Sequence, residues 1–262
     1  MKKPQYLALL AASVLFAGLY FGFSNKPSHL KKAEQPQQVV EEKNVTFEAL
    51  RDEAGTQLTA QQQAQVAELE QQVSASKNDS ERAALLKRLS GLWYSFGDIP
   101  VAGGLAEQVA AIENTDAAWS VAGGNFYNGL TASQDPSIRD YCASHAVKAF
   151  ERAASLAPEK VEHQVNVALV YAENPPPNNP MQAVLMLRDL ESKHPDEPSV
   201  YNALGRLAIK TNQWERAIER LEKARSLDKT NPNTPCLLAK AYEGAGNTAK
   251  ANEFARICNA SR

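Results

Sequence analysis

The stretch YNALGRLAIKTNQWERAIERLEKARSLD (residues 201–228) contains two segments in which apolar residues recur at helical spacing. Asn212 and Gln213 form a short turn between them, which predicts that the two helices are antiparallel neighbours. Gly205 lies in the middle of the first helix, where a glycine costs about 0.5–1 kcal/mol relative to alanine. We expect Gly205 to offset this cost by facing Ala217 where the helices cross, because two small residues let the backbones approach closely.

Small residues recur at the corresponding place along much of the chain, which is the mark of an internal repeat. Those expected in the second helices are Ala102, Ala146, Ala183, Ala217 and Ala251, and the last two intervals are both 34 residues. Their expected partners in the first helices are Ser90, Gly123, Ala168, Gly205 and Ala239. In the first four repeats the run that follows the second-helix alanine has a constant length of twelve residues, ending at Asn114, Pro158, Pro195 and Lys229, so the differences in length lie between the two helices of a pair.

This pattern resembles the tetratricopeptide repeat (TPR), a helix-turn-helix unit of about 34 residues. The residues of the quoted stretch that match the family pattern are Tyr201, Leu204, Gly205, Ala208, Ala217, Leu221 and Ala224. Lys229 stands where the family pattern has a proline. The resemblance implies an all-α solenoid of about five helix pairs. The repeats would span about 83–115, 116–160, 161–197, 198–231 and 232–262.

Two of these repeats contain extra residues between their helices. Asp135 and Pro136 predict the start of a lengthened helix in the second repeat. In the third repeat, ENPPPNNPMQA (173–183) predicts a rigid loop that ends with Asn179 as the helix cap and Pro180 in the first turn. Both insertions fall at the same turn of their repeats, so we expect them on one edge of the array. They are either part of a functional face or neutral variants of a loop.

The front of the chain carries an uncharged run. Lys2 and Lys3 precede it, and residues 6–23 form an 18-residue apolar segment. As a helix this segment is about 27 Å long, close to the roughly 30 Å of a bilayer's hydrocarbon core. A membrane anchor and a cleaved signal peptide both fit residues 1–25, and the lack of a small-residue cleavage site favours the anchor. We expect a single-pass protein of the inner membrane whose repeats lie in the periplasm.

Three further segments follow: a flexible tether (26–45), a helical lead-in (46–80) and the repeat array (81–262). Helix is expected from Thr46 to about Ser76, with a thin apolar stripe of Val66, Leu69 and Val73. The stripe is too short for a coiled coil, so we favour a helix that lies on the first repeat. A coiled coil through this segment, which would make the chain a structural homo-oligomer, is the alternative.

The composition and the scattered polar residues indicate a binding protein and no enzyme. The formal net charge is −2 and no basic run contains aromatic residues, so no nucleic-acid partner is expected. Cys142 and His145 lie one helical turn apart, but no second pair completes a metal site. The histidines, which we expect on solvated surface, are His29, His145, His163 and His194. We expect no cofactor and no small-molecule substrate, because no acid, base and nucleophile converge in the pattern.

The resemblance to TPR proteins also implies a groove lined by the first helices of the repeats. The residues at its groove-facing positions are Lys87, Tyr94, Tyr127, Asn128, Asn202, Arg206, Lys210 and Lys240. One half of this set is aromatic and the other is basic, which suits an extended peptide or a partner helix with an acidic end. The chain is similar to single-pass TPR proteins of Gram-negative envelopes, those of Bacteroidetes in particular. A membrane-anchored adaptor is therefore expected, and c-type cytochrome assembly, a translocon-associated chaperone and a general scaffold all stay open as its role.

The three cysteines are Cys142, Cys236 and Cys258. Cys236 lies near the start of the last repeat's first helix, and Cys258 lies near the end of its second helix. In an antiparallel pair these two positions are neighbours, which favours a disulfide in an oxidising compartment. Two small buried thiols are the alternative. Cys142 is expected to be a free thiol in either case.

Overall fold

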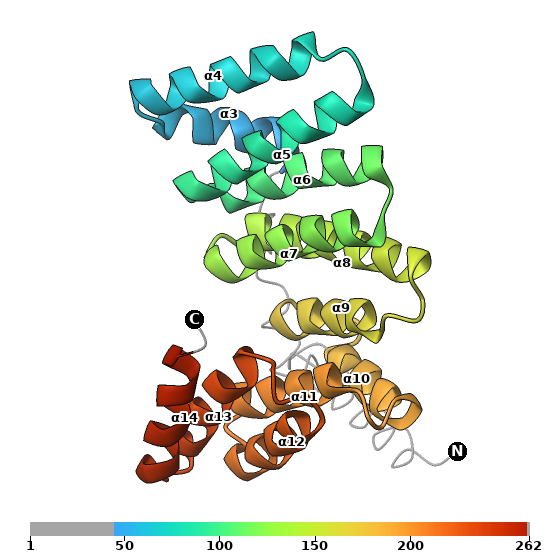
Figure 1. Ribbon diagram of the computed structural model, residues 1–262, viewed down its shortest axis with the longest axis vertical. Coiled ribbons are helices and arrows are strands. Elements are labelled where there is room, and N and C mark those ends of the chain that lie inside the picture. Colours follow the sequence, from blue (N-terminus) through green and yellow to red (C-terminus); the bar gives the residue numbers. More distant parts are fainter. Residues whose placement is uncertain (1–44, 261–262) are drawn as a thin grey trace, which may run out of the picture. The chain divides into compact units, whose positions relative to one another are not determined.

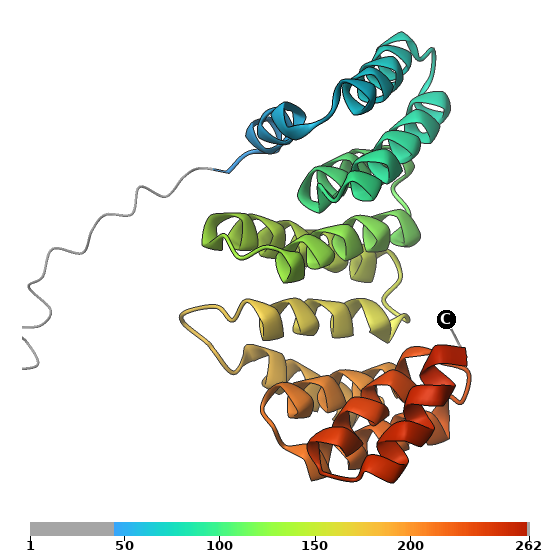
Figure 2. The same ribbon diagram turned by 90° about the vertical axis from the view of Figure 1, so that its left-hand side faces the viewer.

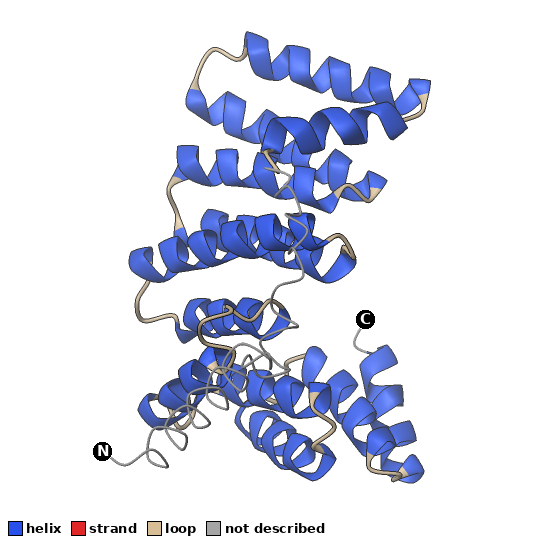
Figure 3. Ribbon diagram, turned by 180° about the vertical axis from the view of Figure 1, so that it is seen from behind, coloured by secondary structure: helices blue, strands red, loops and turns tan. Residues whose placement is uncertain are grey.

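The computed structural model describes residues 45–260, which belong to one compact unit of the chain. Every regular element in this range is a helix, as Figure 3 shows. The twelve helices of this range are α3 (Phe47–Gln57), α4 (Ala60–Ala75), α5 (Asp79–Phe96), α6 (Ile99–Glu113), α7 (Asp116–Ala132), α8 (Pro136–Leu156), α9 (Val161–Glu173), α10 (Gln182–Lys193), α11 (Pro198–Lys210), α12 (Trp214–Leu227), α13 (Asn233–Gly244) and α14 (Thr248–Ala260).

The expected membrane anchor (1–25) and almost all of the expected tether (26–45) lie outside the described residues, and so does His29. None of the helices within residues 45–260 is long and apolar enough to cross a membrane.

The helices pack as successive pairs, and each pair packs on the next (Figures 1 and 2). The five pairs of the repeat region are α5–α6, α7–α8, α9–α10, α11–α12 and α13–α14. The second helix of one pair contacts the first helix of the following pair, as α8 contacts α9 and α12 contacts α13. The all-α, TPR-like solenoid expected from the sequence is therefore confirmed for this range. Its core continues from pair to pair in a series of apolar clusters, because each pair covers the apolar face that its neighbour leaves open.

The helical lead-in is broken where the sequence was expected to form one helix. Leu58 is extended, and Thr59 begins a new helix with a reciprocal cap. The Thr59 hydroxyl accepts a hydrogen bond from the Gln62 backbone at 3.3 Å, and the Gln62 side chain accepts one from the Thr59 backbone at 2.9 Å. A Thr-x-x-Gln capping box of this kind satisfies two otherwise unpaired N–H groups, so it favours a helix start here over continuation. The stripe of α4 lies against the first repeat, with Val66 and Leu69 buried.

Mid-helix glycines make room for large side chains of the neighbouring helix. A Cβ atom on Gly205 would lie 2.6 Å from Cγ and Cδ2 of Leu221. The expected close approach is present, but the residue seated against Gly205 is Leu221 and not Ala217. Gly123 admits the ring of Phe150 in the same way, with a Cβ at 2.7 Å from the ring. At these two crossings a large side chain is seated against a glycine, whereas in the first pair the two small residues meet, because the Ser90 hydroxyl donates a hydrogen bond to the Ala102 carbonyl at 2.8 Å.

The two insertions take different forms. In the second pair, Asp135 caps α8 by accepting a hydrogen bond from the Ser137 backbone at 2.8 Å, and Pro136 is the first helical residue, as expected. In the third pair, α9 ends at Glu173 and α10 begins only at Gln182. Asn179 and Pro180 therefore lie in the loop, and the prediction that they start the helix was wrong by two residues. A turn across residues 176–179, closed by a backbone hydrogen bond, precedes the helix instead.

Candidate functional site

The candidate groove face is carried by the first helices of the pairs, α5, α7, α9, α11 and α13. Most of the predicted groove residues contact one another or a neighbouring helix. Asn128 donates a hydrogen bond to the Tyr94 hydroxyl at 3.3 Å, joining α7 to α5. Thr234 donates one to the Asn202 side chain at 2.9 Å, joining α13 to α11. These polar contacts link successive first helices across the face.

A bridge crosses the middle of this face. Arg206 on α11 donates a hydrogen bond to the Tyr127 hydroxyl on α7 at 2.9 Å, and its guanidinium lies 5.8 Å from the Tyr127 ring. Burial raises the pKa of Tyr127, so its hydroxyl stays neutral and accepts the bond. The two residues come from the second and fourth pairs, so the contact spans the helix α9 between them. We call this contact the Tyr127–Arg206 bridge.

The basic half of the predicted groove is already partly neutralised. Lys210 donates hydrogen bonds to the Ala172 carbonyl at 2.7 Å and to the Glu173 carboxylate at 2.8 Å. An acidic peptide end would have to compete with Glu173 for this lysine. Lys240 lies beside these residues in a cavity of about 520 Å³ between α9, α11 and α13, and Arg206 also lines that cavity.

The aromatic half contains an open slot between α5, α6 and α7, with a volume of about 450 Å³. Tyr94 and Val121 stand on its rim, with 43% and 60% of their surfaces exposed. A Cβ atom on Gly91 would meet no atom within 4 Å, so here no neighbouring side chain fills the space beside the glycine. The ion pair of Lys87 with Glu113, at 2.6 Å, lines the same slot. We call this feature the α5–α7 slot.

The repeat length seen in the sequence is also present in three dimensions. The second helices of the last two pairs begin at Trp214 and Thr248, 34 residues apart. The hydrogen bond between Tyr94 and Asn128 joins two consecutive first helices across the same separation of 34 residues. Five antiparallel helix pairs follow one another in this arrangement. The described residues fold as a TPR-like array of helix pairs.

Comparisons with known proteins returned no matching family model and no matching curated protein. Among solved structures, TTC0263, described as a thermophilic TPR protein of Thermus thermophilus, is 17% identical, with a TM-score of 0.49 over 76% of this chain and 100% of that one. MamA from residue 41 to its end, from Desulfovibrio magneticus, is 18% identical, with a TM-score of 0.38 over 68% of this chain and 94% of that one.

Two histidines of the array are not on solvated surface, so that expectation was wrong for them. His163 is 6% exposed, and its Nε2 lies 3.2 Å from the Asp116 carboxylate. Lys160 binds the same carboxylate at 2.6 Å, and this hydrogen bond lowers the pKa of Asp116. His145 lies 2.8 Å from the Glu107 carboxylate. Both histidines join one helix pair to another, which sequence spacing does not reveal, whereas His194 is exposed as expected.

The described residues contain no group of three or more potential metal ligands. Cys142 is fully buried beside Gly129, and burial raises the pKa of its thiol to about 12. A thiol in this state packs as a small apolar side chain and is a poor metal ligand or nucleophile.

The last helix pair of the array is cross-linked. Cys236 on α13 and Cys258 on α14 form a disulfide, with their Cα atoms 4.9 Å apart. The last pair has no following pair within the described residues to cover it, so the covalent link holds together two helices that lack a neighbour on one side.

Proposed function

We propose that this chain is a protein-binding scaffold whose TPR array receives an apolar side chain of a partner peptide in the α5–α7 slot. One observation carries the proposal: Tyr94 and Val121 stay exposed beside a slot that no side chain of the described array fills. Large apolar side chains gathered around a cavity are typical of binding sites, since their burial by a partner is favourable.

The polar rim of the slot suits a peptide backbone. Asn125 lines the slot, and Asn128 fixes the Tyr94 ring through its side-chain amide nitrogen. The amide oxygen of Asn128 remains an acceptor, and an unpaired asparagine amide offers both a donor and an acceptor. An extended peptide presents the same two groups along its backbone. The slot would then bury an apolar side chain of the peptide, and the two asparagines would fix the position of the peptide backbone along the groove by hydrogen bonds.

We further propose that the array is held at the inner membrane by residues 6–23 and works in the periplasm. The disulfide of the last pair supports an oxidising compartment, where such bonds persist. Delivery of apocytochrome, a translocon-associated chaperone role and general scaffolding are all compatible with this placement. The buried stripe of α4 favours an adaptor over a coiled-coil oligomer. Cysteine alkylation in intact cells with a membrane-impermeant reagent, applied to a variant with one exposed cysteine on the array, tests the compartment.

The α5–α7 slot is tested with a variant whose own side chain occupies it. Random peptides are selected by display on the full-length chain, and an enriched peptide is synthesised with a fluorescent label. Gly91→Leu places a side chain in the slot, whereas Gly124→Leu adds the same group at a helical glycine that also has open space but does not line the slot.

Burying one large apolar side chain contributes about 1.5–3 kcal/mol. Gly91→Leu is therefore expected to weaken binding by about tenfold or more, while Gly124→Leu leaves the affinity unchanged. Equal binding to the two variants would exclude the slot as the site. Circular dichroism of both variants checks that the fold is retained.

A further inference from the structure

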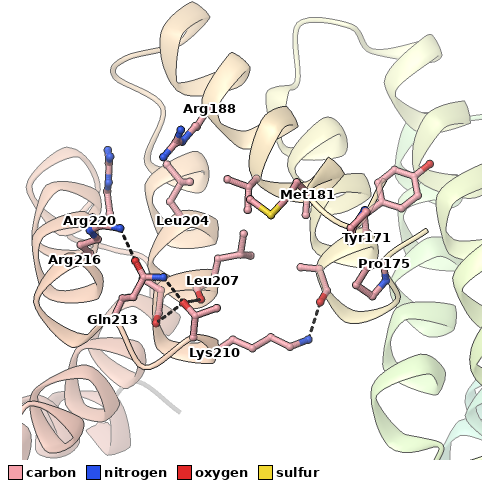
Figure 4. Close-up of a pocket in the computed structure, with 16 residues that line it drawn as sticks. Tyr171, Pro175, Met181, Arg188, Leu204, Leu207, Lys210, Gln213, Arg216 and Arg220 are labelled. Carbon is pink, nitrogen blue, oxygen red and sulfur yellow. Dashed lines mark hydrogen bonds between the residues drawn. The ribbon is translucent and has the colours of Figure 1, made fainter. Parts of the chain in front are cut away.

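A second cavity of the array lies away from the α5–α7 slot, where the insertion of the third pair meets the fourth pair. Its volume is about 630 Å³, and it is lined by the end of α9, the loop before α10, and helices α10, α11 and α12 (Figure 4). It exists at this place because eight residues separate α9 from α10, so the loop forms a wall that the shorter turns of the last two pairs cannot provide.

One part of this cavity is apolar. Met181, just before α10, is 55% exposed, and Leu204 and Leu207 on α11 lie between it and Arg216 and Arg220 in Figure 4. Pro175 lines the same side as Met181. An exposed methionine with leucines behind it can adapt to an inserted apolar side chain, because methionine is flexible and polarizable.

The other part is cationic, and two of its four cations are paired with carboxylates that lie outside the lining. Lys210 binds Glu173 at 2.8 Å, and Arg220 binds Glu191. Within the described residues, the lining of the cavity itself includes no carboxylate.

The remaining two cations have no carboxylate partner among residues 45–260. Arg188 on α10 is exposed, and Arg216 on α12 binds only the neutral side chain of Gln213, at 2.6 Å. Both guanidinium groups belong to the cavity lining, and Figure 4 shows them near one end of it, beside Arg220. This end therefore carries positive charge that the array does not neutralise.

We propose that this cavity is a second docking site, for a peptide segment that carries a large apolar side chain followed closely by a carboxylate. The apolar side chain would lie between Met181 and the two leucines, and the carboxylate would pair with Arg188 and Arg216. Arginine suits this role because its planar group binds a carboxylate through two parallel hydrogen bonds. The apolar part of the lining, Met181, Leu204 and Leu207, favours a peptide over a nucleic acid, because a nucleic acid has no aliphatic side chain to bury there.

The site is isolated for testing by using the full-length Gly91→Leu variant, in which the α5–α7 slot is filled. Random dodecapeptides are selected on it by display, and enriched sequences are expected to place Asp or Glu within a turn's length of a Leu, Ile, Met or Phe. A labelled peptide of the enriched sequence and its Asn or Gln counterpart are then compared by fluorescence anisotropy. An enriched set without acidic residues would overturn the proposal.

A second experiment reverses the charge of the two arginines that would bind the carboxylate. Arg188→Glu with Arg216→Glu is expected to weaken binding of the acidic peptide by about tenfold or more. The matched control, Arg82→Glu with Arg88→Glu, reverses two exposed arginines of α5 that do not line the cavity and is expected to leave the affinity unchanged.

All four arginines are exposed, so both double variants are expected to fold, which circular dichroism checks. Equal binding to the two double variants would overturn the proposal. The outcome is independent of the slot, because the host variant already lacks it.

Discussion

Gly205 and Gly91 both lie inside first helices of the array, yet replacing each with alanine should change stability in opposite directions. At either position alanine recovers about 0.5–1 kcal/mol of helix propensity. At Gly91 the new Cβ meets nothing within 4 Å, so Gly91→Ala should stabilise the array by about that amount. At Gly205 the new Cβ would lie 2.6 Å from two carbons of Leu221, well inside the 3.4–4 Å of ordinary contact.

Leu221 cannot yield easily to this Cβ because it is fully buried. Overpacking of a core costs about 1–3 kcal/mol, so the net result of Gly205→Ala is a loss of roughly 1 kcal/mol. At about 2–4 °C per kcal/mol for a domain of this size, the melting temperatures of the two variants should differ by several degrees. Thermal melts followed by circular dichroism measure the difference. A Gly205→Ala variant that is as stable as Gly91→Ala would refute the close contact.

A double-mutant cycle locates the cause. In a Leu221→Ala background the crowding atoms are gone, so the same Gly205→Ala change should become stabilising. The coupling energy should therefore have the size of the overpacking penalty, about 1–3 kcal/mol. Additive effects would show that the destabilisation arises somewhere other than at Leu221.

Three further outcomes follow from the cysteines and from Asp116. Reducing the disulfide opens a loop of 22 residues, and by chain entropy the closed loop stabilises the fold by roughly 3 kcal/mol. Amide hydrogen exchange in α13 and α14 should therefore accelerate after reduction. Unchanged exchange would contradict the stabilising role of the Cys236–Cys258 bond. Cys142, with its pKa near 12, should resist alkylation at mildly alkaline pH until the chain is unfolded, and labelling of the folded chain would show that it is accessible. Because Lys160 lowers the pKa of Asp116 below its ordinary 3.8, its stabilising effect is present above that value and is lost as the pH falls through the folded-state pKa. In the Asp116→Asn variant the free energy of unfolding should therefore fall less steeply as the pH is lowered. Urea melts at several acidic pH values measure this slope, and a slope equal to that of the unmodified chain would count against the Lys160–Asp116 pairing.

The features predicted well from the sequence are those set by local spacing. The apolar periodicity and the short turn at Asn212 and Gln213 are local, so the antiparallel α11 and α12 follow from them. The pairing partner of Gly205 was missed because it depends on the rotation of one helix against the other, which a list of small residues does not define. The break at Thr59 was readable as a Thr-x-x-Gln capping box, but the helix-forming residues on both sides concealed it.

The candidate sites depend on contacts between residues far apart in the chain, and this limited their prediction. Tyr94 was expected on the groove, but nothing in the sequence distinguishes Gly91, which has open space, from glycines such as Gly123 that a ring fills. His163 is buried and its ring nitrogen contacts Asp116, 47 residues away. The cation-lined cavity was not predicted, although the insertion that builds its wall was recognised as unusual.

The Tyr127–Arg206 bridge has a consequence for how the array opens. In a linear array each unit is coupled to its immediate neighbours, and an end can fray one unit at a time. A bond between residues 79 positions apart adds coupling between the second and fourth units, which do not follow one another. The third unit cannot melt without either breaking this bond or leaving it to span an unfolded segment. Units two to four should therefore unfold as one cooperative block, with independent fraying confined to the two ends of the array.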